Sequence, residues 1–369
     1  DVANVMREYE RFSTAAMNAF IGPRTSFYLN NLQEKLNNEG FRANLRIVQS
    51  NGGISTVETC SRRAVSMLMS GPAGGVIGGK TEGLSCGSHN IITVDIGGTS
   101  ADISTIPDGQ IKIMNPRDSY VSGHPILIPM IDLVTIGAGG GSIAYVDSAG
   151  GFHVGPRSAG ADPGPACYGR GGEEPTVTDA QVVLGRLDAD KMLGGDLLLD
   201  PELARRAIES KIAKSLNISA TDAALGIIKV INSNMALAIR SNSVARGVDP
   251  REYSLMPFGG AGPLHGVALA ESVSAKNVIV PVAPGITAAM GLLQTDMQYE
   301  HARSLIASLS KVTSDTAERM NSVLKELISE CRQDLEKDGV PAARHNFQRI
   351  AECRYHGQGF ELRADIPEG

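Results

Sequence analysis

The segment 94–102, Val-Asp-Ile-Gly-Gly-Thr-Ser-Ala-Asp, limits what this chain can fold into more than any other segment. β-Branched residues precede its glycines at 91–94, and strand-forming residues resume at 101–106. Two short strands joined by a glycine turn are therefore expected. The length of the pattern, with an acid on each side of the turn, favours a turn that holds a polyphosphate. The alternative is a β-hairpin turn with two solvated acids.

The residue types inside this turn suit a phosphate ligand. Glycine lets backbone N–H groups come close to phosphate oxygens, and a hydroxyl adds a further donor. Asp95 can hold a magnesium-bound water or orient an attacking water, and Asp102 on the returning strand can help to position the metal. The predicted phosphate-binding residues are Gly97, Gly98, Thr99 and Ser100.

A second glycine-rich segment, Phe258–His265, lies between a predicted strand and a predicted helix. A nucleotide base or ribose can lie on glycine backbone there and face the N-terminus of the helix. The segment does not match Gly-x-Gly-x-x-Gly, and a tight strand-to-helix loop without a ligand stays an alternative. We expect His265 to be a helix residue rather than a catalytic base. The predicted nucleotide-binding residues are Gly259, Gly260, Ala261 and Gly262.

Charge and cysteine content exclude several classes of protein. The formal net charge is −6 and no basic stretch interleaves with aromatic residues, which argues against a nucleic-acid partner. The five cysteines form no CxxC pair, which favours neither a disulfide framework nor a zinc site and fits the cytoplasm best. No uninterrupted apolar run reaches the ~18 residues that span a bilayer, so we expect no membrane partner.

The remaining sequence predicts an α/β protein. Residues 1–40 show two helical runs separated at Gly22-Pro23. Glycine and proline are so frequent over 107–175 that a β-rich insert is expected there, whereas the apolar spacing over 178–247 is helical. The other predicted elements are strands and a helix over 253–280, a helix over 320–335 and two strands over 347–365.

Four segments occur in the order found in the superfamily of actin, sugar kinases and heat-shock chaperone ATPases. They resemble its first connecting helix, second phosphate loop, adenosine loop and second connecting helix, and they are Ser70–Gly79, Asp95–Asp102, Phe258–His265 and Pro284–Gly291. Three further segments resemble the hydantoinase A / 5-oxoprolinase family. They are Gln49–Gly53, Thr135–Ser142 and Ser158–Gly169. The resemblance covers nearly the whole chain.

The resemblance implies an actin-like ATPase (ribonuclease H-like) α/β fold with a β-rich, glycine-rich insert and a helical subdomain. It also implies five parts. These are the end of the first lobe with the connecting helices (1–90), the second-lobe phosphate loop and β-rich insert (91–175), the helical subdomain (176–250), the adenosine loop and second connecting helix (251–310), and a helix with the start of a C-terminal region (311–369).

One departure from the superfamily pattern bears on activity. The superfamily has another phosphate loop of the Asp-x-Gly-Gly-Thr type near its N-terminus, and this sequence has only the loop at 95–99. We therefore expect an internal fragment of a longer subunit, with the first N-terminal lobe largely missing. Such a fragment alone is expected to be inactive.

Members of the family couple ATP hydrolysis to the opening of a cyclic amide, such as N-methylhydantoin or 5-oxoproline, or to the activation of acetone or acetophenone for carboxylation. The resemblance thus implies ATP and Mg²⁺, or another divalent metal, as cofactors, and phosphorylation of a carbonyl oxygen as the shared step. It also implies a hydantoinase B-like partner subunit or domain. Opening of a small cyclic amide is the preferred function. The alternatives are the activating subunit of a ketone carboxylase and a non-catalytic domain of this fold.

His124, Asp132 and Asp179 fall in family-like segments and are the candidate metal ligands. Their spacing matches no compact metal motif. The alternative is that His124 and Asp132 hydrogen-bond to loops and that Asp179 caps the helix after Thr178. Cys167 has no histidine beside it in sequence, so we expect a buried packing residue rather than a nucleophile.

Overall fold

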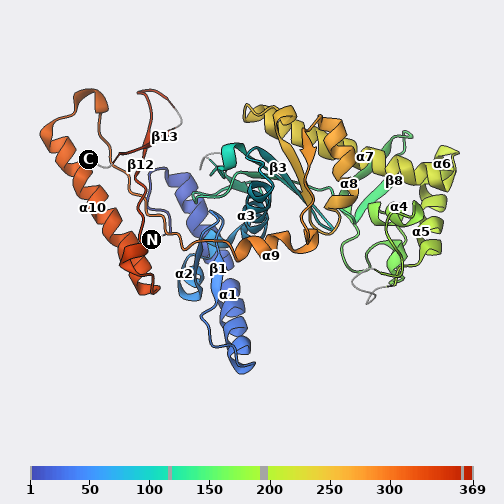
Figure 1. The fold of residues 1–369 in the computed structure, drawn as a ribbon, viewed down its shortest axis with the longest axis horizontal. Helices are drawn as coiled ribbons and strands as arrows, with labels where there is room; N and C mark the ends of the chain where they lie inside the picture. Colours follow the sequence, from blue (N-terminus) through green and yellow to red (C-terminus); the bar gives the residue numbers. More distant parts are fainter. Residues whose placement is uncertain (1, 115–118, 192–197, 359–360, 368–369) are drawn as a thin grey trace. The chain divides into compact units, whose positions relative to one another are not determined.

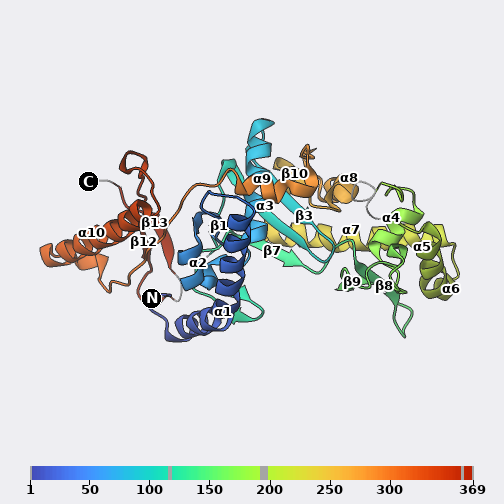
Figure 2. The same cartoon turned by 90° about the horizontal axis from the view of Figure 1, so that it is seen from below.

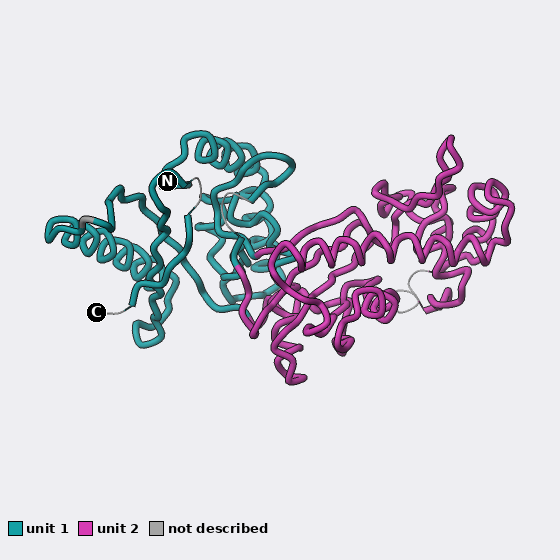
Figure 3. The backbone as a smooth tube through the Cα atoms, turned by 90° about the horizontal axis from the view of Figure 1, so that it is seen from above, with its two compact units in different colours: residues 1–73, 113–131, 295–369 teal, residues 74–112, 132–294 magenta. Residues whose placement is uncertain are grey.

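The computed structural model describes residues 2–114, 119–191, 198–358 and 361–367. The chain forms two compact units, which are drawn in teal and magenta in Figure 3. Unit 1 comprises 1–73, 113–131 and 295–369, and unit 2 comprises 74–112 and 132–294. Both glycine-rich segments predicted to bind nucleotide belong to unit 2.

Unit 2 is built on a five-stranded sheet (Figure 1). Its strands are β3 (Ile91–Ile96), β4 (Ala101–Ile106), β7 (Leu133–Ile136), β10 (Ser254–Phe258) and β11 (Asn277–Val278). They lie in the order β11-β10-β3-β4-β7. β4 pairs antiparallel with both β3 and β7, whereas β10 pairs parallel with both β3 and β11. Three antiparallel strands followed by two parallel ones form the sheet of a ribonuclease H-like lobe, which confirms the predicted fold class.

Helices cover both faces of this sheet (Figure 2). The even-numbered residues of β3 belong to the main hydrophobic cluster, to which α7 (Ala220–Ala245) and α8 (Gly262–Val273) contribute from one side. On the other side lies α3 (Ser70–Ser85), where a Cβ on Gly83 would come within 2.2 Å of the Ile91 side chain. Successive side chains of a strand point to opposite faces, so Asp95 points to the same side as Ile91, toward α3.

The two predicted connecting helices pack backbone to backbone. In α9 (Thr287–Leu292), a Cβ on Gly291 would lie 2.0 Å from the carbonyl oxygen of Gly74 and 2.6 Å from the backbone nitrogen of Gly78, both in α3. Only glycine permits such an approach. The small-residue composition of both segments therefore has a packing cause.

Strands of a β-rich insert and the helices of a helical subdomain are both present in unit 2. The insert includes a hairpin of β8 (Ser142–Val146) and β9 (Phe152–Ser158). The helices that precede α7 are α4 (Val177–Val183), α5 (Pro201–Ile208) and α6 (Lys214–Leu216). The Asp200 side chain caps α5 by accepting hydrogen bonds from two backbone N–H groups, as the Asp-Pro pair predicts.

Helix α7 is long and apolar enough by composition to cross a membrane, and it is the one such helix in the described part of the chain. Half of its apolar stretch is buried inside the protein. It supplies Ile227, Ile231 and Met235 to the main hydrophobic cluster. These contacts are those of a core helix.

Unit 1 contains shorter strands and two long helices. Its elements are α1 (Glu8–Asn38), β1 (Arg46–Val48), β2 (Ile54–Thr56), α2 (Val57–Arg62), β5 (Tyr120–Val121), β6 (His124–Pro125), α10 (Ser314–Lys337), β12 (Ile350–Cys353) and β13 (Leu362–Asp365). The strands pair as three two-stranded antiparallel sheets, β1-β2, β5-β6 and β12-β13. The predicted helix over 320–335 is α10, and the two predicted strands over 347–365 are β12 and β13.

The predicted break at Gly22-Pro23 is wrong, because α1 is one continuous helix with Pro23 inside it. Side chains on both sides of the proline hold the helix against the end of α2. The Asn18 amide donates to the carbonyl of Arg62, and the Ser26 hydroxyl donates to the carbonyl of Ser61. These tertiary hydrogen bonds compensate for the backbone bond that proline removes.

Candidate functional site

The turn between β3 and β4 brings the two predicted acids together. Asp95 lies opposite Asp102 in the antiparallel register, so both side chains point to the same face of the sheet. The four residues between the strands form a tight turn closed by a 3.0 Å hydrogen bond from the Gly97 N–H to the Ser100 carbonyl. The strand-turn-strand predicted from the sequence is therefore confirmed.

A second glycine run supports this turn from behind. The N–H groups of Gly140 and Gly141 donate to the carbonyls of Gly97 and Gly98, at 3.0 and 2.6 Å. A Cβ on Gly139 would lie 2.7 Å from both the Gly97 oxygen and a turn nitrogen, so the run can approach only without side chains. The carbonyls of Gly97 and Gly98 are thus directed toward the protein.

The amides of the turn are left free. Within the described residues, the backbone N–H groups of Gly98, Thr99 and Ser100 make no hydrogen bond, and Gly98 and Thr99 are exposed. The space that a Cβ on Gly98 would take is empty to 4 Å. Carbonyls that are held and amides that are free form a cradle for an anion, and this arrangement fits the phosphates of a nucleotide.

Burial raises the pKa of both acids. Burial, together with the charge of Asp102, raises the pKa of Asp95 to about 6. Burial also raises the pKa of Asp102, against a hydrogen bond that its carboxylate accepts from Thr135. Thr135 lies opposite Asp102 in β7, so the three side chains form a row across three neighbouring strands. Two carboxylates are the number with which proteins usually hold Mg²⁺ beside phosphates, so the pair fits that ion.

The loop after β10 lies against the first turn. The Ala261 N–H donates to the carbonyl of Ile96 at 2.9 Å, and a Cβ on Gly259 would lie 2.2 Å from Oδ1 of Asp95. Gly259 also has a φ of +83°, which favours glycine. A Cβ on Gly260, in contrast, would meet nothing within 4 Å. The two predicted loops therefore meet at the carboxyl ends of parallel strands, where α/β sheets bind ligands.

His265 is a buried helix residue, as expected from the sequence. Its Nδ1 lies 2.7 Å from Oδ1 of Asn232, and its Nε2 lies 3.4 Å from the amide nitrogen of Gln181. Burial, assisted by the charge of Arg186, lowers its pKa to about 4, so the ring is neutral at physiological pH. The ring helps to hold the first turn of α8 against α4 and α7.

The described residues do not bring the three candidate metal ligands together within one unit. No group of three or more His, Cys, Asp or Glu side chains in the described residues is arranged to hold a metal ion. Asp132 forms an ion pair with Arg246 instead. His124 is exposed in β6 of unit 1, whereas the other two candidates belong to unit 2. The alternative that Asp132 hydrogen-bonds to a loop is also incomplete, because its carboxylate pairs with the Arg246 side chain.

Asp179 has a structural role at the start of α4. It is fully buried in a capping box with Thr176 at the start of α4, so the helix begins two residues earlier in the chain than a start after Thr178 would place it. Its carboxylate also accepts hydrogen bonds from the N–H groups of Ala166 and Cys167, at 3.3 and 2.8 Å. Cys167 itself is buried, and burial raises the pKa of its thiol far above the usual range. A nucleophilic thiolate is excluded there.

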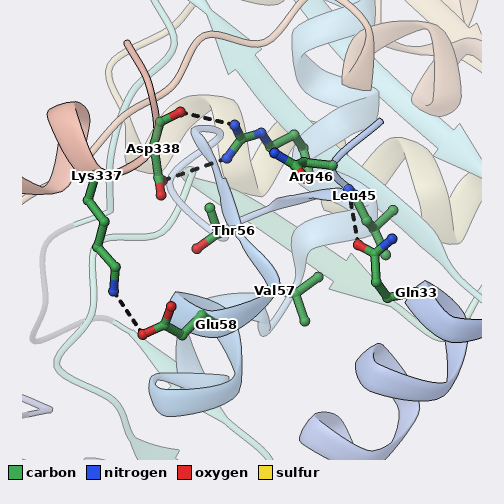
Figure 4. Close-up of a pocket in the computed structure, with 9 residues that line it drawn as sticks. Gln33, Leu45, Arg46, Thr56, Val57, Glu58, Lys337 and Asp338 are labelled. Carbon is green, nitrogen blue, oxygen red and sulfur yellow. Dashed lines mark hydrogen bonds and ion pairs between the residues drawn. The ribbon is translucent and has the colours of Figure 1, made fainter. Parts of the chain in front are cut away.

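The pocket drawn in Figure 4 is a different feature, in unit 1. Its two cations already have partners. Arg46 Nη2 donates to the carbonyl of Asp338 at 3.1 Å, and Lys337 Nζ lies 2.8 Å from Oε1 of Glu58 (Figure 4). This pocket therefore offers no free positive charge for a phosphate.

Sequence reasoning missed three kinds of supporting residue. From the sequence, Thr135 and the glycines 139–141 were recognised only as part of a family-like segment, although they contact Asp102 and the phosphate turn. Gly75 was recognised only as a small residue of a helix. A Cβ on Gly75 would lie 3.3 Å from Oδ2 of Asp95. The glycine clustering was the available signal, but the contacts join segments that are about 20 to 45 residues apart in the sequence.

The sheet and the two loops have the arrangement of one lobe of the actin-like, ribonuclease H-like fold. The family model for hydantoinase/oxoprolinase proteins matches residues 11–301, and the chain belongs to this family.

Three relatives illustrate its range. The chain is 40% identical over 362 residues to caprolactamase subunit alpha of Pseudomonas jessenii, covering 98% of the chain and 52% of that protein. It is 33% identical over 377 residues to 5-oxoprolinase of Saccharomyces cerevisiae, covering 97% and 28%. The nucleotide-free structure of an acetone carboxylase superposes with a TM-score of 0.83 at 29% identity, covering 98% and 51%. The chain thus spans about half the length, or less, of the relatives it matches.

Proposed function

We propose that this chain carries one phosphate-binding lobe of an ATP-dependent cyclic amidase. The observation that carries the proposal is the turn 97–100, in which the carbonyls of Gly97 and Gly98 are held from behind and the amides of Gly98, Thr99 and Ser100 are free beside two carboxylates. Related proteins with solved structures are an ATP-dependent caprolactamase and an acetone carboxylase whose carboxylation is ATP-dependent. Use of ATP is therefore common to the caprolactamase and the acetone carboxylase to which the chain is similar.

The residues have separate roles in this proposal. The amides of Gly98, Thr99 and Ser100 would hold phosphate oxygens, and Asp95 and Asp102 would hold a magnesium-bound water. The glycine loop 259–262 would hold the ribose and base at the start of α8. When bound, ATP supplies the phosphoryl group that turns the carbonyl oxygen of a cyclic amide into a leaving group.

A cyclic amide is favoured over a ketone by the comparisons. Identity is 40% with caprolactamase subunit alpha, a name that describes a lactam substrate, and 30% with the acetone carboxylase beta subunit of Xanthobacter autotrophicus. N-Methylhydantoin and 5-oxoproline are the cyclic amides expected from the sequence. Activation of a ketone for carboxylation is the second candidate, favoured by the TM-score of 0.83 with acetone carboxylase.

Two further proposals concern the surroundings of the protein. A hydantoinase B-like partner is proposed because the relatives named above include an alpha and a beta subunit, which are parts of larger assemblies. A cytoplasmic location is proposed because the cysteines in the described residues are free thiols, as reducing compartments maintain them.

The test is ATP hydrolysis by the full-length protein with its partner, measured with 5-oxoproline, N-methylhydantoin or caprolactam, and separately with acetone and bicarbonate. A cyclic amide should stimulate hydrolysis, and Asp95→Asn should lower the stimulated rate at least about 100-fold, as loss of a catalytic group does. Asp188→Asn, which alters an exposed carboxylate paired with Lys191, is the matched control. Full activity of Asp95→Asn would refute the assigned site, and stimulation by acetone alone would establish the second candidate.

A further inference from the structure

Helix α1 exposes a row of large aromatic side chains. Tyr9, Phe12, Phe20 and Phe27 are 72%, 67%, 83% and 69% exposed. The whole chain has only eight tyrosines and eight phenylalanines, so this helix displays a quarter of them in one row. Exposed apolar side chains are ordinary when scattered, but a contiguous row on one element marks a surface that binds something.

The spacing places these side chains on a single face of α1. At 100° per residue, positions 9, 12, 20 and 27 fall within an arc of roughly 80°, together with the exposed Ala16 and Pro23. From 9 to 27 the row is roughly 27 Å long. We call these six residues the aromatic face of α1.

The opposite side of α1 is already occupied. Met17 and Ile21 pack against the buried cluster of Val65, Ile126, Ile128 and Met130. α1 has its main contacts with α2, the turn Ala64–Met67 and β6, all within unit 1. The helix therefore has two apolar sides, and only one of them is covered.

The described residues of unit 1 form no sheet as large as that of unit 2. Each of its sheets in the described residues has two strands, and an isolated two-stranded sheet is only marginally stable. Unit 2, in contrast, buries both faces of a five-stranded sheet. Because α1 has one covered and one exposed apolar side in a unit of small sheets, another layer of structure is expected to pack on the exposed side.

We propose that apolar residues from the part of the family's longer chains that lies beyond these 369 residues pack against the aromatic face of α1. Nearly all of this chain, 98%, matches only 52% of caprolactamase subunit alpha, so that relative carries about as much chain again. A membrane is disfavoured because α1 carries three acidic and three basic residues and so has no net positive charge for anionic lipid. The proposal does not depend on the activity proposed above.

The test compares the 369-residue chain with the full-length protein. In each, Phe12, Phe20 and Phe27 are replaced together by serine, which has a similar helix propensity to phenylalanine. Tyr120→Ser, at another exposed aromatic residue of unit 1, is the matched control. Amide hydrogen exchange of α1, Tm and the oligomeric state are measured for every protein.

We expect amides of α1 to exchange at least tenfold more slowly in the full-length protein than in the chain. The triple variant should remove that protection and lower the Tm of the full-length protein by several degrees, while leaving the Tm of the chain within about a degree. Equal exchange of α1 in both proteins would overturn the proposal. So would a discrete dimer of the chain that the triple variant dissociates, because a second copy would then be the occupant, and so would a natural protein with no residues beyond these 369.

Discussion

Substitutions at Gly139 and Gly98 distinguish the packing that supports the phosphate turn from the binding of phosphate by the turn. A Cβ on Gly139 would lie 2.7 Å from the Gly97 oxygen and the Thr99 nitrogen, and 2.8 Å from the Gly98 carbonyl carbon. All three atoms are backbone, so none can rotate away. Forcing an extra methyl into such packing costs about 1–3 kcal/mol. Gly139→Ala should therefore destabilise unit 2 and displace the turn.

Gly98→Ala should behave in the opposite way. Its Cβ would meet nothing within 4 Å, and its backbone conformation is one that alanine adopts. Stability should be unchanged or slightly higher, because alanine reduces the freedom of the unfolded chain by about 0.4–1 kcal/mol. The methyl would instead occupy the space in which phosphate approaches the free amides. Loss of one hydrogen bond to a charged group costs about 1.5–3 kcal/mol, which is roughly a 10- to 150-fold loss of nucleotide affinity.

The assay is urea unfolding of each variant, with nucleotide affinity measured by calorimetry on the full-length protein. Gly139→Ala should lose both stability and affinity, and Gly98→Ala should lose affinity alone. If Gly98→Ala bound Mg-ATP as tightly as the wild type, the open space beside Gly98 would not be the phosphate position. If Gly139→Ala kept full stability, the close approach of the glycine run to the turn would be wrong.

Three further predictions follow from the same contacts. The folded state keeps the proton of Asp95 up to about pH 6, whereas the unfolded chain loses it near pH 3.8, so Asp95 reduces stability as pH rises through this window. Asp95→Asn should therefore be more stable than wild type by about 1–3 kcal/mol at pH 7 and equal to it below pH 4. A stability difference that stays constant across pH would contradict the raised pKa of Asp95. Gly291→Ala, whose Cβ would lie 2.0 Å from the Gly74 oxygen, should lower the urea midpoint by at least as much as Gly139→Ala, and an unchanged midpoint would count against the packing of α3 on α9. Asp179→Asn should lower the free energy of unfolding by about 1–3 kcal/mol, because an amide nitrogen would face backbone donors. EDTA should leave the wild-type Tm unchanged, and a fall in Tm with EDTA would support a metal at Asp179.

The local parts of the site could be predicted from the sequence. The strand-turn-strand at 91–106 is specified by neighbouring residues, since β-branched runs on each side of two glycines leave few alternatives. The loop at 259–262 is specified in the same way by the strand before it and the helix after it. Order along the chain then gave the fold class.

The parts that failed depend on residues far apart in the sequence. Asp132 was a candidate metal ligand because it falls in a family-like segment. Its partner Arg246 lies 114 residues away, so the sequence near Asp132 gives no signal of the ion pair. The break at Gly22-Pro23 was predicted from local propensity, whereas Asn18 and Ser26 hold that helix against α2 by tertiary contacts. The support of the phosphate turn by the glycines 139–141 was missed for the same reason.

The central claim is that ATP activates a carbonyl oxygen at this lobe, and oxygen isotope transfer tests it most directly. The full-length protein with its partner is given ATP and a cyclic amide whose carbonyl oxygen is ¹⁸O. If that oxygen takes the phosphoryl group and later leaves carbon with it, the label must appear in inorganic phosphate, and water must replace it on carbon. We predict one ¹⁸O per phosphate released during ring opening, and release of labelled phosphate at least about 100-fold slower with Asp95→Asn. Unlabelled phosphate, with all ¹⁸O kept in the product carboxylate, would contradict the account.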